Sequence, residues 1–184
     1  MKPKLFIVTG NKMKFEELAG KLAEFFVCEQ KIFNEPEIQG SPEDIIKHKL
    51  SRAYEVFGGS VFVDDTSVHL EELNGFPGPY MKDFWKCFTP QEMGIKFAGS
   101  RMKVINHVGI CTGKGKMIFA DGVVEGKIIA PKHNDHKGRE FDLFMQVDGT
   151  DRPMLEYSTE EKNKFSHRGL AVENLLAILR KENK

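Results

Sequence analysis

The chain has 184 residues with an ordinary globular composition, and we expect a single domain over residues 1–184. Its 27 lysines and arginines balance 27 aspartates and glutamates, which argues against nucleic acid or an acidic membrane as a partner, so any anion site must be built locally. Three widely spaced cysteines (Cys28, Cys87 and Cys111), no apolar run of membrane-spanning length and no signal-peptide pattern favour a cytoplasmic protein.

The first predicted elements are a strand over residues 5–8 and a helix that starts directly after the turn Thr9-Gly10-Asn11. Apolar residues at helical spacing mark that helix: Phe15, Leu18, Leu22 and Phe25. Free backbone N–H groups and a partial positive charge at the helix start favour an anion such as a phosphate chain. The alternative is a turn that only caps the helix, because the stretch has neither a GxxxxGKS/T nor a GxGxxG pattern.

A second strand is predicted over residues 27–33 and a second helix over residues 42–57. Ser41 is placed to cap this helix, and Pro42 suits its first position. The pair Gly58-Gly59 is expected to end it.

An acidic pair follows a short apolar strand predicted over residues 61–63. Asp64 and Asp65 would lie at the carboxyl end of that strand, where ligands gather in α/β folds. Successive side chains of a strand point to opposite faces, so at most one of the two faces a given pocket unless the chain turns. A carboxylate there can bind Mg²⁺ or deprotonate a water, and the alternative is a turn aspartate that caps the backbone near Thr66.

The remaining predicted elements complete an α/β pattern. In chain order they are a half-exposed strand over 68–70, a turn at Asn74-Gly75, helices over 80–88 and 90–99, a hairpin of strands 102–112 and 116–129 joined by Gly113-Lys114-Gly115, a strand over 141–147, a helical turn from Ser158 and a last helix from near Ser166. Gly122 and Gly126 are expected at bulges or close backbone contacts. This order predicts a mixed β-sheet flanked by helices.

Two further segments carry polar groups suited to a metal or a phosphate. Glu37, in a loop that ends at Gly40, is either a metal ligand or simply solvated. Near the C-terminus, a break between helices holds Lys162, Lys164, Ser166, His167 and Arg168. Lysine and arginine neutralise phosphates, and histidine can donate to a phosphate or a base edge. The alternative is an exposed charged loop in which the serine caps the last helix.

Together these segments resemble one family. The matching motifs are Thr9-Gly10-Asn11-x-x-Lys14, Pro36-Glu37-x-Gln39-Gly40, Asp64-Asp65-Thr66, Gly75-Phe76-Pro77-Gly78-Pro79-Tyr80, Glu125-Gly126-Lys127-Ile128 and Glu161-Lys162-Asn163-Lys164-x-Ser166-His167-Arg168. From residue 4 to about 180 the chain is similar to the inosine triphosphate pyrophosphatase family, which removes deaminated purine nucleotides such as ITP, dITP and XTP. The first and last motifs are quite specific to it.

The resemblance implies an elongated fold with two lobes around a central nucleotide cleft, usually as a homodimer. It implies Mg²⁺-dependent hydrolysis of a nucleoside triphosphate to the monophosphate and pyrophosphate. Substrate-binding roles fall on Thr9, Asn11 and Lys14 at the phosphates, on Lys49 and Thr66 as further contacts, and on Phe141, Lys162, Ser166, His167 and Arg168 around the base. Glu37 and Asp65 would bind the metal, and Asp65 would also be the general base for the attacking water.

One departure concerns recognition of the base. The family usually has Phe-Gly-Tyr/Trp-Asp-Pro before the last loop, whereas this chain has Phe141-Asp142-Leu143-Phe144-Met145. If Phe144 points into the base pocket, selection by hydrogen bonds weakens and the nucleotide range broadens. Changing Leu143 to Trp and Phe144 to Asp would then restore a preference for ITP or XTP. If instead Asp142 replaces the missing carboxylate, selection is kept.

Two rival functions follow from the same residues. The altered run favours a nucleotide-binding regulatory protein of the same fold with lost or altered catalysis. The retained acids Glu37, Asp64 and Asp65 weigh against it, because a pure binder has no evident need for a buried acidic pair. A nucleic-acid-binding domain is disfavoured by the zero net charge.

Overall fold

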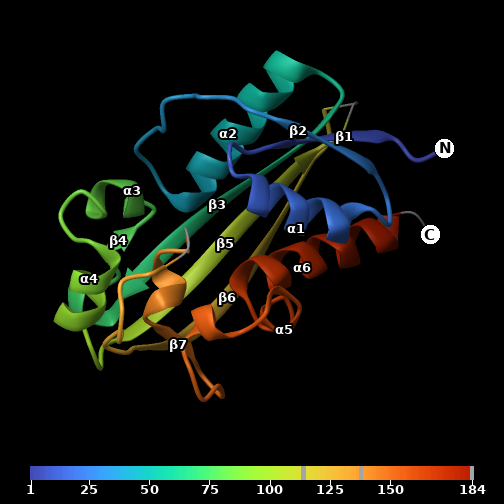
Figure 1. Ribbon diagram of the computed structural model, residues 1–184. Coiled ribbons are helices and arrows are strands. Elements are labelled where there is room, and N and C mark those ends of the chain that lie inside the picture. Colours follow the sequence, from blue (N-terminus) through green and yellow to red (C-terminus); the bar gives the residue numbers. More distant parts are fainter. Residues whose placement is uncertain (113–114, 137–138, 183–184) are drawn as a thin grey trace. The chain divides into compact units, whose positions relative to one another are not determined.

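A computed structural model describes residues 1–112, 115–136 and 139–182 of the chain, and Figure 1 shows its α/β fold. The strands are β1 (Lys4–Val8), β2 (Val27–Lys31), β3 (Ser60–Leu70), β4 (Pro77–Gly78), β5 (Arg101–Cys111), β6 (Met117–Ile128) and β7 (Met145–Val147). The α-helices are α1 (Lys12–Leu22), α2 (Pro42–Phe57), α3 (Met81–Phe84), α4 (Pro90–Lys96), α5 (Thr159–Lys162) and α6 (His167–Glu182). Short 3₁₀ turns are η1 (Glu71–Leu73), η2 (Phe141–Leu143) and η3 (Met154–Glu156).

The strands form a mixed sheet in the order β2-β1-β3-β5-β6-β7, with β4 beside β3. Strand β1 pairs in parallel with both β2 and β3, whereas β3–β4 and β6–β7 are antiparallel pairs. Parallel neighbours need a crossover, and helices α1 and α2 supply it. The predicted mixed sheet flanked by helices is confirmed.

The predicted helix starts are confirmed because their signals are local. Ser41 Oγ accepts a hydrogen bond from the Asp44 N–H at 3.2 Å, and Pro42 is the first residue of α2. Gly58 ends the helix with φ 61°, a left-handed value that suits glycine. Ser166 Oγ accepts from the Gly169 N–H at 3.0 Å at the start of α6.

The acidic pair does not lie at a strand end, which corrects the prediction. One continuous strand, β3, runs from Ser60 to Leu70 and carries Asp64 and Asp65 in its middle. Burial of Val68 and Leu70 in a hydrophobic core and pairing with β4 hold the strand extended beyond the acids. Local sequence suggests a break at two aspartates, but packing and strand pairing override that preference.

Other predicted boundaries differ in detail. The aromatic helix predicted over 80–88 is only α3, the helix predicted over 90–99 ends at Lys96, and the strand predicted over 141–147 is the turn η2 followed by β7. Strands β5 and β6 confirm the predicted hairpin, although Gly113 and Lys114 of its turn lie outside the described residues. A Cβ atom added at Gly126 would lie 2.2 Å from the Gln146 carbonyl oxygen, which confirms the expected close backbone contact.

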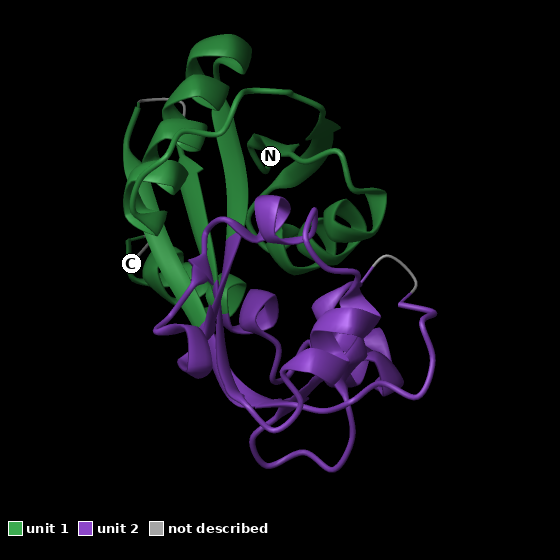
Figure 2. Ribbon diagram, turned by 90° about the vertical axis from the view of Figure 1, so that its left-hand side faces the viewer, with its two compact units in different colours: residues 1–65, 106–122, 171–184 green, residues 66–105, 123–170 purple. Residues whose placement is uncertain are grey.

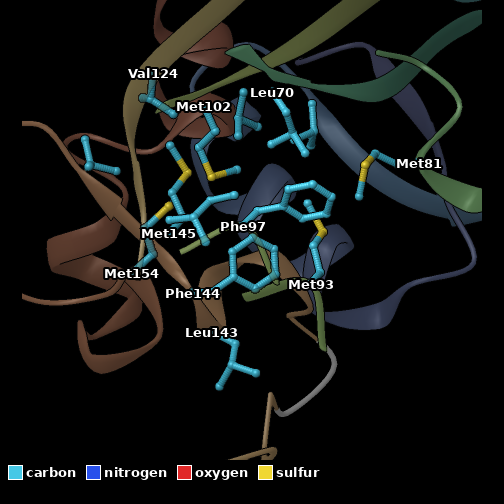
Figure 3. Packing of buried hydrophobic residues seen from close by; sticks show 14 of the residues in the cluster. Leu70, Met81, Met93, Phe97, Met102, Val124, Leu143, Phe144, Met145 and Met154 are labelled. Carbon is cyan, nitrogen blue, oxygen red and sulfur yellow. The ribbon is translucent and has the colours of Figure 1, made fainter. Parts of the chain in front are cut away.

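The chain divides into two compact units, coloured separately in Figure 2. Unit 1 contains residues 1–65, 106–122 and 171–184, and unit 2 contains residues 66–105 and 123–170. In unit 1, β1, β3, β5 and β6 contribute buried side chains to one core with α1 and α6, whereas β3 and β5 contribute buried side chains to a second core with α2. The core of unit 2 is rich in methionine and phenylalanine (Figure 3). The single domain and the central cleft stay predictions.

Two further features concern the cysteines and the helices. Cys28, Cys87 and Cys111 are all free thiols. Among the described residues, no helix combines the length and the apolar character that crossing a bilayer requires.

Candidate functional site

The two aspartates of β3 lie on opposite faces of the sheet in unit 1. Phe62 packs in the core that contains α1, whereas Val61 and Val63 pack in the core that contains α2. Side chains alternate along a strand, so Asp64 lies on the α1 face and Asp65 on the α2 face. The predicted separation of the two carboxylates is therefore observed.

On the α1 face, Asp64 contacts a lysine and an asparagine. The Lys14 ammonium lies 3.3 Å from Asp64 Oδ2, and the Asn106 side-chain N–H donates to the same oxygen at 3.3 Å. Asn106 is fully buried and also donates to the Asp65 carbonyl oxygen at 2.8 Å. This asparagine therefore fixes the carboxylate of one aspartate and the backbone of the next.

On the α2 face, one ammonium joins two carboxylates. Lys49 donates to Asp65 Oδ1 at 2.5 Å and to Glu37 Oε1 at 2.8 Å. Helix α2 supplies Lys49, and the loop before that helix supplies Glu37. The structure thus brings together three residues for which the resemblance implies substrate or metal contacts.

Burial, together with the neighbouring charges, shifts the pKa values of Asp65 and Lys49. Burial raises the pKa of Asp65 above its ordinary value, and the neighbouring Asp64 and Glu37 carboxylates raise it further, while Lys49 opposes the rise. Burial alone would lower the pKa of Lys49, but Asp65 and Glu37 outweigh burial and raise it. A carboxylate with a raised pKa is a stronger base once it is ionised.

The turn before α1 satisfies its own polar groups. Thr9 Oγ1 accepts from the Asn11 N–H and Asn11 Oδ1 accepts from the Lys14 N–H, both at 3.2 Å. Gln30 donates to the Thr9 carbonyl oxygen at 2.9 Å. The structural alternative, Asn11 as the helix cap, is therefore confirmed. A Cβ atom added at Gly10 would meet nothing within 4 Å, so the turn is open to an approaching group. Its phosphate role stays a prediction.

The residues on the α2 face fit a hard divalent cation. Glu37 and Asp65 present carboxylate oxygens to one point, which the Lys49 ammonium occupies here. Within the described ranges, no group of three or more histidines, cysteines or acids could hold a metal ion. Mg²⁺ fits such a sparse site because it commonly uses one or two carboxylates and completes its shell with waters and substrate phosphates.

In unit 2, the residues expected around the base form a second cluster. Lys162 donates to Asp142 Oδ2 at 2.7 Å, and Arg139 Nε lies 3.9 Å from the same oxygen. The Phe141 and His167 rings meet edge to face, with centroids 5.2 Å apart. Four of the five residues expected at the base are buried: Lys162, Ser166, His167 and Arg168. The exposure expected in the alternative is therefore wrong for these four residues, whereas its capping serine, Ser166, is confirmed and Lys164 is exposed.

Phe144 does not face a pocket, which removes the reason for expecting a broad nucleotide range. Its side chain is fully buried in the core of unit 2, where its ring centroid lies 6.3 Å from that of Trp85 (Figure 3). Asp142 instead provides the acidic group of this run. The expectation that Leu143→Trp with Phe144→Asp would restore base selection is therefore wrong, because the second change would put a charge in the core.

Two polar features of the structure were not predicted from the sequence. In β5, every second residue is buried and apolar (Met102, Val104, Val108 and Ile110), except Asn106. A polar residue at a position where the alternation predicts a buried apolar one could have indicated this site. Buried His107 lies 2.8 Å from Asp121, through Nδ1 and Oδ1, and no spacing along the chain links those two. Thr66 follows Asp65 in β3, belongs to unit 2 and is half-buried.

The comparisons with known proteins point to one family. A family model described as the Ham1 family matches residues 5–178. The chain is 34% identical over 187 residues to an inosine triphosphate pyrophosphatase of Scheffersomyces stipitis, covering 94% of this chain and 95% of that protein. It is 35% identical over 176 residues to the protein of the same name from Tuber melanosporum, covering 93% and 94% of the two chains.

Solved structures agree on the fold. A HAM1 protein from Coxiella burnetii superposes with a TM-score of 0.81 at 20% identity, covering 98% of this chain and 100% of that one. The Ham1 protein of Staphylococcus aureus gives 0.73 at 20% identity, covering 97% and 99% of the two chains.

Proposed function

The chain belongs to the Ham1 family, and from that premise we propose that it hydrolyses purine nucleoside triphosphates such as ITP, dITP and XTP. The products are the nucleoside monophosphate and pyrophosphate, and the reaction depends on Mg²⁺. The cellular role is removal of aberrant nucleotides from the pool.

The observation that carries the proposal is the arrangement of charges on β3. Attack at the α-phosphorus needs a positioned water, a base and cations on the leaving pyrophosphate. Asp65 is a largely buried carboxylate with a raised pKa, and it takes the proton from the water. Lys14 and Lys49, each beside one aspartate, neutralise phosphate oxygens together with the turn that contains Thr9 and Asn11.

Different residues would bind the metal ion and the purine base. Glu37 and Asp65 would hold Mg²⁺, which supplies charge neutralisation and polarises the phosphoryl oxygens when bound. Phe141 stacks on the base, and Lys162, Ser166, His167 and Arg168 contact the base side of the nucleotide. Thr66 is a further contact with the substrate.

The test is release of pyrophosphate from a panel of triphosphates. We expect turnover of ITP, dITP and XTP with Mg²⁺, slower turnover of ATP and pyrimidine triphosphates, and none with EDTA. Monophosphate and pyrophosphate should appear in equal amounts. No turnover of any nucleotide, or release of orthophosphate instead, would contradict the proposal.

A second candidate is a nucleotide-binding protein that does not hydrolyse its ligand. The observation in its favour is the Lys49 ammonium, which engages Glu37 and Asp65 at the same time. Calorimetric binding of ITP with Mg²⁺ but without product would support this candidate over the enzyme.

We also propose a cytoplasmic homodimer that binds neither nucleic acid nor membranes. The free cysteines support the cytoplasmic assignment, and the zero net charge argues against nucleic acid and acidic membranes as partners. The homodimer rests on the resemblance to the inosine triphosphate pyrophosphatase family. Sedimentation equilibrium at micromolar concentration measures the assembly state, and a monomer would contradict that part of the proposal.

A further inference from the structure

Asp142 and Lys162 form an ion pair inside unit 2. Their side chains are only 4% and 7% exposed, and the Lys162 ammonium lies 2.7 Å from Asp142 Oδ2. Asp142 lies in the turn η2, whereas Lys162 is the last residue of α5, twenty residues further along the chain.

Stability alone does not explain this pair. Removing two charges from water is costly, and replacing a buried ion pair by well-packed apolar residues is often neutral or stabilising. Leu143, Phe144 and Met145 follow Asp142 directly and are buried in the core of unit 2, so an apolar environment is at hand. Retention of two charges at this place is more readily explained by recognition of a ligand.

The pair uses one of the donors of the ammonium. An ammonium has three N–H donors, and among the described residues Asp142 is its one hydrogen-bond acceptor. A single strong bond to a side chain that is itself buried sets the direction of the remaining donors. The adjacent residue Phe141 contacts His167, so the turn that carries the carboxylate also carries part of the expected base site.

The carboxylate also changes what the ammonium attracts. An unpaired lysine binds any phosphate as a point charge. Asp142 offsets much of the charge of Lys162, although Arg139 Nε also lies 3.9 Å from the same carboxylate oxygen. A lysine whose charge is offset in this way favours an uncharged acceptor such as a carbonyl oxygen, and it repels a donor such as an amino group. The lysine then distinguishes two bases both by bonding to the carbonyl group of one and by repelling the amino group of the other.

We propose that Asp142 is a positioning residue for base recognition, which holds Lys162 so that its free N–H donors meet a ring carbonyl oxygen of the purine. This inference rests on the proposed function for the identity of the ligand. Asp142 acts through Lys162 and does not itself touch the base.

The test measures nucleotide binding without turnover. Isothermal titration calorimetry in EDTA compares ITP, which has a 6-carbonyl group, with ATP, which has a 6-amino group. We expect the parent protein to prefer ITP and Asp142→Asn to reduce the ratio of the two dissociation constants at least tenfold, the size of one buried charged hydrogen bond. Asp148→Asn is the matched control, because Asp148 is paired with Arg101 at 2.6 Å on the exposed surface of the same unit.

A double variant separates positioning from folding. Asp142→Leu with Lys162→Met replaces the pair by apolar groups, and we expect a Tm near that of the parent without recovery of the ITP preference. A folded double variant that still prefers ITP, or an Asp142→Asn protein with an unchanged ratio, overturns the inference. Equal binding of ITP and ATP by the parent overturns it too, whereas the proposed hydrolysis is judged separately by pyrophosphate release.

Discussion

At the scale of single residues, the proposed chemistry depends most on Asp65. We expect Asp65→Asn to lower kcat by about 10²- to 10⁴-fold, the usual contribution of a general base. Because burial raises the pKa of Asp65, its ionised form is lost on acidification at a higher pH than for a free aspartate. The parent should therefore lose activity at the acid end of its pH profile, and pyrophosphate release across pH measures this.

The control for that change is another paired aspartate. Asp83 is exposed and lies 2.5 Å from Lys86. Asp83→Asn should leave both kcat and the pH profile unchanged. An Asp65→Asn protein with nearly the parental rate and a native circular-dichroism spectrum would remove Asp65 from the mechanism.

Lys14 and Lys12 test whether a lysine acts on the phosphates or only on the helix surface. Lys14 is two-thirds buried beside Asp64, whereas Lys12 is 83% exposed and 3.9 Å from Glu16. Lys14→Ala should raise KM by roughly tenfold, because one charged hydrogen bond to the substrate is lost. Lys12→Ala should change KM less than twofold, and equal effects of the two changes in steady-state kinetics would argue against the assignment.

Glu29 provides a test of electrostatics away from the site. Its hydrogen bonds with Lys31 and Lys4 lower the pKa of this exposed carboxyl from 4.5 to about 2. The stabilising contribution is therefore present above pH 4.5 and is lost as the pH falls towards 2. Carbon-detected NMR titration should give a midpoint near 2, and Lys31→Met should move it upward. A midpoint above 4 in the parent would show that the pairs do not persist in solution.

At the scale of secondary structure, two helical glycines predict effects of opposite sign. A Cβ atom added at Gly20 in α1 would meet nothing within 4 Å, so Gly20→Ala should stabilise the protein by roughly 0.4–1 kcal/mol. A Cβ atom added at Gly169 in α6 would lie 2.3 Å from the Asn163 carbonyl oxygen. Gly169→Ala should therefore destabilise by roughly 1–3 kcal/mol.

Urea unfolding of the two glycine variants measures both changes on one scale. A Gly169→Ala variant as stable as the parent would mean that the segment before α6 can move away from the helix. The same close approach explains why a glycine follows the run Ser166-His167-Arg168, where local helix preference would favour alanine.

At the scale of the whole molecule, the core of unit 2 limits how the base site can be changed. Phe144 is fully buried, so Leu143→Trp with Phe144→Asp would leave an unpaired carboxylate in that core. We expect a loss of about 4 kcal/mol or more in the free energy of unfolding, a large share of the total for a domain. Val123→Asp, at an apolar position 45% exposed in the same unit, should change it by less than about 0.5 kcal/mol. Recovery of a stable, soluble double variant would contradict this description of the core.

The sequence by itself determined the features that rest on local hydrogen bonds and short periodicities. Ser41 with Pro42, Ser158 and Ser166 marked the helix starts because a cap bonds only two or three residues ahead. Alternation and turn residues placed the long hairpin of β5 and β6. The ordered motifs also identified the family, since they preserve residue types at defined separations.

Only the tertiary structure decided which distant groups meet. Asp64 pairs with Lys14 fifty residues away, Asp65 with Lys49, and Asp142 with Lys162. The local sequence does not encode strand pairing and core burial, which keep β3 continuous across Asp64 and Asp65. Core burial also places the Phe144 side chain inside unit 2. A side chain's neighbours and its burial depend on how separate elements pack, so the partners, and with them the pKa of Asp65, follow from the fold rather than from any local pattern.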